Sequence, residues 1–125
     1  MTRYTGILLL LTVAALAGLC RAAESPEAMY QRAVNNPNFP KEGFGEQFCW
    51  HARVGMRGFL PAYEATGDTA YLDWAVKYFD FLLGKMETGP DGYKGWIGPY
   101  IYDGSVWCDV HVGDAILMAG MLAFS

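Results

Sequence analysis

The sequence predicts a mainly α-helical fold with one short β-hairpin and loop insertion. Apolar residues recur every three or four positions in several segments after residue 25, which is the spacing of helices buried along one face. Between residues 88 and 113 this period stops, and glycine, aromatic residues and single polar residues take its place. An Asp-Gly pair between β-forming residues inside this stretch favours a tight turn. Helices interrupted by one hairpin are therefore expected.

Residues 1–22 form the first predicted element, a cleavable secretory signal peptide. Arg3 precedes an uncharged, apolar run, and small residues gather before an expected cut after Ala22. The run has about 15 residues and is shorter than the ~20 that cross a bilayer, so we expect no stable membrane span after cleavage. The protein is therefore expected to be secreted or periplasmic, with residues 23–125 as one helical-hairpin domain.

Residues 25–36 have the pattern of a well-formed helix. Ser25 can cap the helix, Pro26 suits the first helical position, and Glu27 places a negative charge in the first turn. Prolines at positions 37 and 40 forbid continuation. The first helix is therefore expected to end at Asn36 in a turn-rich connector.

A second helix is expected from residues 43–46 to Ala65, and a third from Thr69 to Met86. Pro61 is expected to kink the second helix or to mark its last turns, because proline lacks a backbone N–H and clashes with the preceding turn. Between the two helices, Gly67 can adopt the left-handed conformation that ends a helix. Asp68 can then cap the third helix.

The expected hairpin covers residues 101–106, with Asp103 and Gly104 in its turn. A last helix is expected from about Val112 to the end of the sequence. This segment is apolar on nearly all sides and carries no stop signal. Because such a helix must be covered by further structure, we expect the chain to continue beyond Ser125.

Charge and motif content exclude several classes of function. Loss of Arg3 and Arg21 with the signal peptide would make the formal net charge of −4 more negative by two units. Such a chain repels phosphate backbones, so no nucleic-acid partner is expected. The sequence has no glycine-rich phosphate loop, no cysteine-pair metal motif and no serine nucleophile elbow. We therefore predict no metal site and no cofactor.

The two cysteines outside the signal peptide leave two interpretations open. Cys49 and Cys108 would reach an oxidising compartment, where a disulfide between them is allowed by number. They could equally remain as two buried thiols in a helical core, since cysteine is among the most buried residue types. Nothing in the sequence fixes the distance between them.

Asp109 and His111 are the predicted catalytic residues. Alternate residues of an extended segment face the same side, so Trp107, Asp109 and His111 would project together. A carboxylate beside an imidazole can assist proton transfer. Metal binding is disfavoured, because a catalytic metal normally needs a third protein ligand. The structural alternative is that Asp109 or Asp114 caps the last helix while His111 bonds to nearby backbone.

The predicted substrate-binding residues are aromatic or cationic. Flat aromatic faces stack on the apolar C–H faces of sugar rings, and arginines four apart on one helix face can bind a carboxylate or a sulfate. The alternatives are aromatic side chains that fill the core and an arginine pair that is solvated at the surface. The predicted set is Trp96, Tyr100, Trp107, Arg53 and Arg57.

The segment Tyr63-Glu-Ala-Thr-Gly-Asp-Thr-Ala-Tyr-Leu72, followed by Ala75, resembles the helix, Thr-Gly-Asp turn, helix junction of six-hairpin carbohydrate enzymes. The resemblance covers about residues 43–125. It implies an incomplete (α/α)6 toroid and places the loop from Gly89 to Asp114 near the mouth of the ring. The superfamily includes glycoside hydrolases, unsaturated uronyl hydrolases, sugar epimerases and, in related toroids, polysaccharide lyases. None of its catalytic signatures matches a position here.

The functional expectation that follows is a secreted carbohydrate-processing enzyme, present as an N-terminal portion and acting as a glycoside hydrolase on an acidic or decorated polysaccharide. A polysaccharide lyase is one alternative, since it would abstract the proton beside a uronate carboxylate. A noncatalytic helical-repeat module that binds a glycan or a protein is the other. The sequence does not decide among hydrolase, lyase and epimerase.

Overall fold

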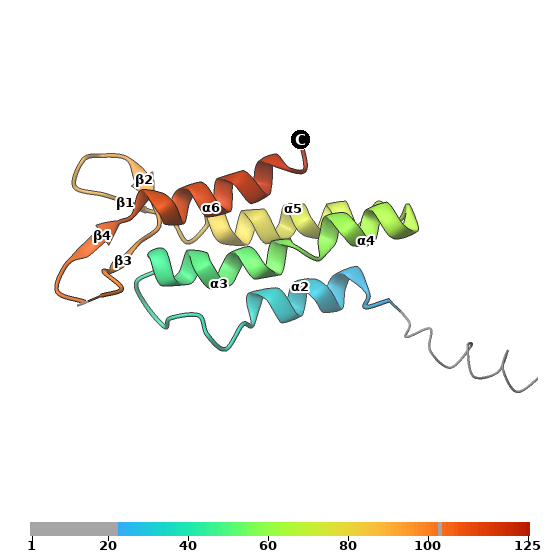
Figure 1. Ribbon diagram of the computed structural model, residues 1–125, viewed down its shortest axis with the longest axis horizontal. Coiled ribbons are helices and arrows are strands. Elements are labelled where there is room, and N and C mark those ends of the chain that lie inside the picture. Colours follow the sequence, from blue (N-terminus) through green and yellow to red (C-terminus); the bar gives the residue numbers. More distant parts are fainter. Residues whose placement is uncertain (1–22, 103) are drawn as a thin grey trace, which may run out of the picture.

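A computed structural model describes residues 23–102 and 104–125. The predicted signal peptide and Asp103, in the predicted hairpin turn, lie outside the described residues. The described chain is mainly α-helical, as predicted, and it has two small antiparallel strand pairs (Figure 1). In chain order the elements are α2 (Pro26–Val34), α3 (Glu46–Met56), α4 (Phe59–Thr66), α5 (Ala70–Leu83), β1 (Glu87–Thr88), β2 (Lys94–Gly95), β3 (Ile97–Pro99), β4 (Trp107–Asp109) and α6 (His111–Leu122).

The local start and stop signals act where the sequence predicts them. Ser25 caps α2, with its hydroxyl oxygen accepting a hydrogen bond from the Ala28 N–H at 3.2 Å. Gly67 ends α4 in the left-handed conformation, with φ 70°, and its N–H donates to the Tyr63 carbonyl at 2.7 Å. The Asp68 carboxylate accepts from the Ala70 N–H at 2.9 Å and so supports the start of α5.

The predicted second helix is two helices, which corrects the expectation of one helix with a kink. The break falls at Arg57 and Gly58, between α3 and α4. Pro61 lies in the first turn of α4, where the backbone N–H that proline lacks would have no intrahelical partner in any case. The chain therefore breaks one turn before the proline, at the carbonyl that its ring would have met.

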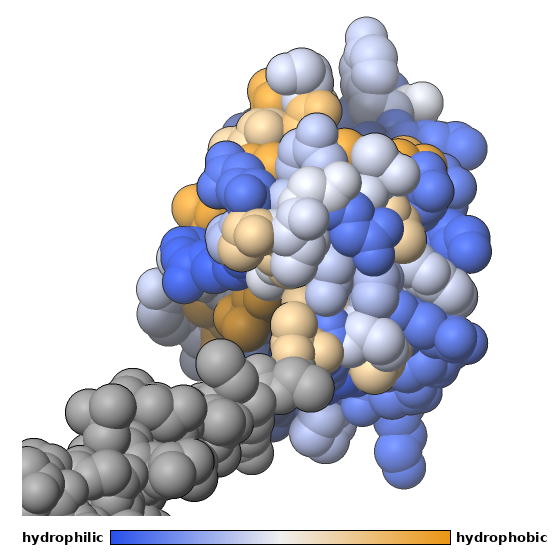
Figure 2. All heavy atoms as spheres, turned by 90° about the vertical axis from the view of Figure 1, so that its right-hand side faces the viewer, coloured by the Kyte–Doolittle hydropathy of each residue, from blue (hydrophilic) through white to orange (hydrophobic). Residues whose placement is uncertain are grey.

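Helices α2, α3, α5 and α6 form two pairs, and the two helices within each pair are parallel to each other. Gly113 and Gly120 of α6 pack against Cys49 and Met56 of α3, so these two helices point the same way. Helices α2 and α5 pack on each other and on α3, and both run in the opposite direction to it (Figure 1). The core lies between these layers and includes Phe48, Cys49, Ala52, Phe59, Ala75, Tyr78, Leu82 and Leu117, all fully buried. The far end, at the α4–α5 turn, is mostly hydrophilic (Figure 2).

Tyr78 links α5 to α3 through the core. Its buried hydroxyl donates to the Ala52 carbonyl at 2.9 Å, and burial raises the pKa of the Tyr78 phenol above its ordinary value.

We expect Tyr78→Phe to lower the free energy of unfolding by about 1 kcal/mol, because the hydrogen bond is lost while the ring packing stays. Urea unfolding monitored by circular dichroism measures this. An unchanged midpoint would show that this bond adds nothing to stability.

The hairpins differ from the prediction in position and in number. Strands β3 and β4 pair with Gly98 opposite Cys108, so the predicted hairpin at 101–106 is the connecting loop of a hairpin whose strands lie outside it. The loop closes through the Tyr100 N–H, which donates to Val106 at 2.8 Å, with Gly104 at φ 64°. A second hairpin, β1–β2, was not predicted, because its strands have only two residues each.

Candidate active site

The candidate site lies where the first turns of α3 and α6 meet the two hairpins (Figure 1). Glu46 is the first residue of α3, and Asp109 ends β4 just before His111 begins α6. Asp114 lies in the first turn of α6. Helix N-termini carry partial positive charge and favour anions, so two of them side by side favour the carboxylates gathered here.

Asp109 and Asp114 form an interacting carboxyl pair. Partial burial raises the pKa of Asp114, the negative charge of Asp109 raises it further, and the Trp96 backbone N–H and His111 oppose the shift. The Oδ1 atom of Asp114 is buried and has no hydrogen-bond partner among the described residues. Asp109 is exposed. The Asp109 carboxyl therefore reaches solvent, while the Asp114 carboxyl holds its proton more strongly than a solvated aspartate does.

Gly95 makes the space for this pair. A Cβ atom at this position would overlap the Asp109 carboxylate. Any other L-residue at position 95 would push Asp109 away from Asp114. Sequence analysis missed both Gly95 and the pairing with Asp114, because the partners meet only once β2 and α6 are packed. The sequence signal that exists is a glycine in a strand, which often marks close approach of another group.

Glu46 and Cys49 complete the buried side of the site. Glu46 is only 7% exposed, and its carboxylate accepts a hydrogen bond from the Trp50 indole N–H at 3.1 Å. Burial and the negative charges of Asp114, Asp109 and Glu46 raise the pKa of Cys49 to about 12. The thiol therefore stays protonated at neutral pH and is not a nucleophile. Cys49 and Cys108 are separate thiols in this structure, which therefore does not contain the disulfide. Only Cys49 is a buried thiol in the helical core, since Cys108 is half-buried in β4.

The predicted aromatic binding residues separate into surface and core. Trp107 is 52% exposed beside Gly43, where a Cβ atom would lie 2.9 Å from its ring, and Tyr100 stacks edge-on with Tyr102. Trp96 is 1% exposed, and its indole N–H donates to the Leu82 carbonyl at 2.9 Å. This corrects the prediction that Trp96 binds substrate: its ring is part of the core, as the alternative interpretation had it.

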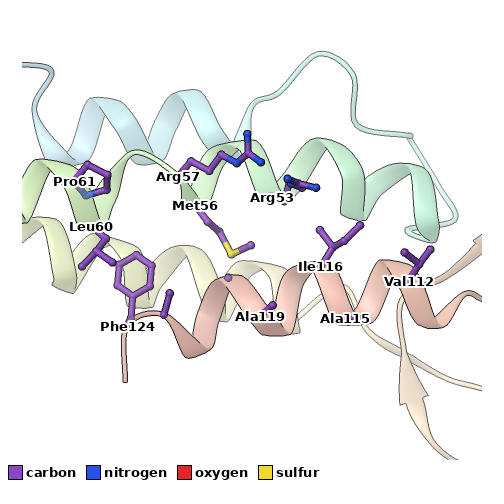
Figure 3. A pocket seen from close by; sticks show the side chains of 12 residues that line it. Arg53, Met56, Arg57, Leu60, Pro61, Val112, Ala115, Ile116, Ala119 and Phe124 are labelled. Atoms are coloured by element: carbon purple, nitrogen blue, oxygen red, sulfur yellow. The ribbon is translucent and has the colours of Figure 1, made fainter.

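The two predicted arginines lie away from the carboxyl pair. Arg53 and Arg57 line an apolar groove of about 530 Å³ between α3, α4 and α6 (Figure 3). The Arg53 guanidinium stacks on Trp50, with its Cζ 5.4 Å from the ring centroid. The structure thus brings Trp107, Asp109 and His111 to the end of the bundle and leaves both arginines along the flank of α3.

The pairing of Asp109 with Asp114 predicts how stability depends on pH. Because the folded-state pKa of Asp114 is raised, the folded protein binds a proton that the unfolded chain has already lost, and stability falls as pH rises from about 4 through the folded pKa. We expect Asp114→Asn to remove this fall and to raise the urea midpoint at pH 7. Asp91→Asn, in the β1–β2 turn, is the matched control. Parallel pH profiles for wild type and Asp114→Asn would contradict the proton-holding role.

Within residues 23–102 and 104–125, no three His, Cys, Asp or Glu side chains are grouped so that they could hold a metal ion. None of the described helices is long and apolar enough to cross a membrane. Comparisons of the chain with models of known protein families, with curated proteins and with solved structures found no match.

Proposed function

We propose that this chain is part of an exported carbohydrate-processing enzyme, a glycoside hydrolase that acts on a polysaccharide. The observation that carries the proposal is the carboxyl pair Asp109–Asp114, which lies at the meeting point of two helix N-termini. Asp109 ends the strand that begins with the exposed Trp107. Sugar hydrolysis needs groups that move protons and a flat surface that holds an uncharged ring. This end of the bundle offers two interacting carboxyl groups and an exposed indole ring, which supports the proposal.

Asp109 is the proposed general base. Asp109 is exposed and can take a proton from an attacking water, while burial and the charge of Asp109 raise the pKa of the neighbouring Asp114. His111, two residues further on, is the proposed acid and returns a proton to the departing sugar oxygen. Asp114 acts through Asp109 and is a positioning residue. The proposed site thus keeps the predicted residues Asp109 and His111 and adds the carboxyl group of Asp114.

The helix arrangement supports the proposed (α/α)6 toroid. Toroids have an inner ring of parallel helices covered by an outer ring that runs the opposite way, and here α3 and α6 are parallel neighbours covered by the antiparallel α2 and α5. The α4–α5 junction at Thr66, Gly67 and Asp68 is the segment that resembles the superfamily. We propose that α3 and α6 belong to the inner ring and that the hairpins lie at its mouth.

A noncatalytic glycan-binding module is the second candidate. The exposed rings of Tyr100, Tyr102 and Trp107 on the β3–β4 hairpin favour it, because stacking needs no carboxyl pair.

A lyase would use Asp109 or His111 as base at a uronate and would release an unsaturated sugar. Reducing-end assays separate turnover from binding, and ultraviolet absorbance of the products separates lyase from hydrolase.

Trp107→Ala tests the carbohydrate part of the proposal. On a panel of neutral and uronate-containing polysaccharides, we expect KM to rise about tenfold with kcat nearly unchanged, since a lost stacking face costs about 1–1.5 kcal/mol of binding. Tyr93→Ala is the matched control, because Tyr93 is an even more exposed ring on the other hairpin. If Tyr93→Ala raised KM as much as Trp107→Ala, stacking at Trp107 would not be the cause.

A further inference from the structure

The groove between α3, α4 and α6 is apolar, elongated and edged by two cations. Its lining from α6 and the turn that follows extends from Val112 to Phe124, about 18 Å at the helical rise per residue. Small residues on the α6 side line part of this length, and Arg53 and Arg57 stand on the opposite side (Figure 3). The groove lies on the face of α3 and α6 that is turned away from α2 and α5.

The two arginines have unused binding capacity. They are four residues apart on one helix face, a spacing that puts their Cβ atoms about 6 Å from each other. Among the described residues neither guanidinium has a salt bridge, and the Trp50 ring holds Arg53 in place. The chain as a whole has a formal net charge of −4, so a pair of unmatched cations beside an apolar groove is a local exception. It favours an anionic partner with an apolar face.

We propose that this groove binds an amphipathic helix of a second polypeptide, with an apolar stripe against α6 and two carboxylates one turn apart against Arg53 and Arg57. Helices dock into grooves through apolar anchors at positions i, i+3, i+4 and i+7, and a groove of this length takes about three turns of helix. Carboxylates one turn apart match the spacing of the arginines.

A second copy of this chain fits the groove less well. Helix α6 is the most apolar helix of the described chain, and it is the one whose exposed face a second copy would offer. That helix carries no carboxylate beyond Asp114 in its first turn. A copy of α6 in the groove would therefore cover the apolar floor and leave both arginines unmatched. The proposal rests on neither Asp109 nor the carbohydrate chemistry above.

The test uses the full chain and a labelled synthetic peptide of about 14 residues, with leucines at helical spacing and two glutamates one turn apart on the flank of the leucine stripe. We expect saturable binding by fluorescence anisotropy, weakened at least tenfold by Arg53→Glu with Arg57→Glu. A peptide with lysines in place of the glutamates should bind that double variant and not the wild type. Lys41→Glu with Lys94→Glu, two exposed cations outside the groove, gives the same change in net charge as a control.

Ala119→Trp fills the groove from an exposed position on α6 and should abolish binding while leaving the circular dichroism spectrum unchanged. The proposal would be overturned if the lysine peptide bound the Arg53→Glu, Arg57→Glu variant no better than it bound the wild type. So would a concentration-dependent dimer that Ala119→Trp dissociates, because the occupant would then be a second copy. Displacement of the peptide by laurate at micromolar concentration would assign the groove to a small amphiphile and would also overturn it.

Discussion

Gly98→Ala is expected to lower the free energy of unfolding by about 3 kcal/mol, at the upper end of the range for overpacked sites. A Cβ atom at Gly98 would lie 2.5 Å from the Gly45 backbone nitrogen and 2.6 Å from the Gly43 carbonyl oxygen. These are backbone atoms, which cannot swing away as a flexible side chain can. The substitution must therefore push the β3–β4 hairpin away from the start of α3. Urea unfolding measures the loss.

Gly67→Ala is the control that separates overlap from backbone strain. Gly67 has φ 70°, and a Cβ atom there would meet nothing within 4 Å, so only the left-handed conformation is penalised. That penalty is about 1–2 kcal/mol. If Gly98→Ala costs no more than Gly67→Ala, the close approach of the hairpin to α3 is not a stability determinant.

Gly98→Ala should also disturb the site, because the same hairpin carries the catalytic candidate. Gly98 pairs with Cys108, the neighbour of Asp109 in β4. A shift of β3 therefore moves Asp109 relative to Asp114, which is on α6. We expect the pH dependence of stability assigned to Asp114 to weaken in Gly98→Ala, even under conditions where the variant remains folded.

The parts of the fold that the sequence predicts are those decided within one turn of the chain. Ser25 caps α2 and Gly67 ends α4 because each acts on backbone groups three or four residues away. Helical periodicity identifies α3, α5 and α6 for the same reason, since one buried face repeats along each segment. The break between α3 and α4 was mislocated, because Pro61 can either kink a helix or sit in a first turn, and packing decides which.

The parts that escaped prediction depend on contacts between distant segments. Alternation placed Trp107 and Asp109 on one strand correctly, but it wrongly extended that strand to His111, which begins α6. It also could not show that Asp109 meets Asp114 in the space left by Gly95. The burial of Trp96 is set by Leu82, fourteen positions earlier, which accepts its N–H. Aromatic residues serve cores and sugar sites equally well, so composition alone cannot assign either role.

Asp109→Asn is expected to reduce kcat by a factor of about 10²–10⁴ on any polysaccharide that the wild type hydrolyses, which is the usual contribution of a general base. KM should change little, because the proposed stacking face at Trp107 is unchanged. The fold should persist, since Asp109 is exposed and asparagine keeps its shape. Glu87→Gln, an exposed acid on the neighbouring hairpin, is the matched control and should leave kcat unchanged.

The same variant carries a second readout that does not depend on finding a substrate. Asp109 raises the pKa of Asp114 by its negative charge, so Asp109→Asn should lower that pKa toward its ordinary value. The fall of stability with rising pH should then occur over a narrower range that begins at the same pH of about 4. If kcat falls while this pH profile is unchanged, Asp109 acts without Asp114. If the profile shifts while kcat stays within threefold of wild type, the carboxyl pair is structural, and the glycan-binding module is the better account of this chain.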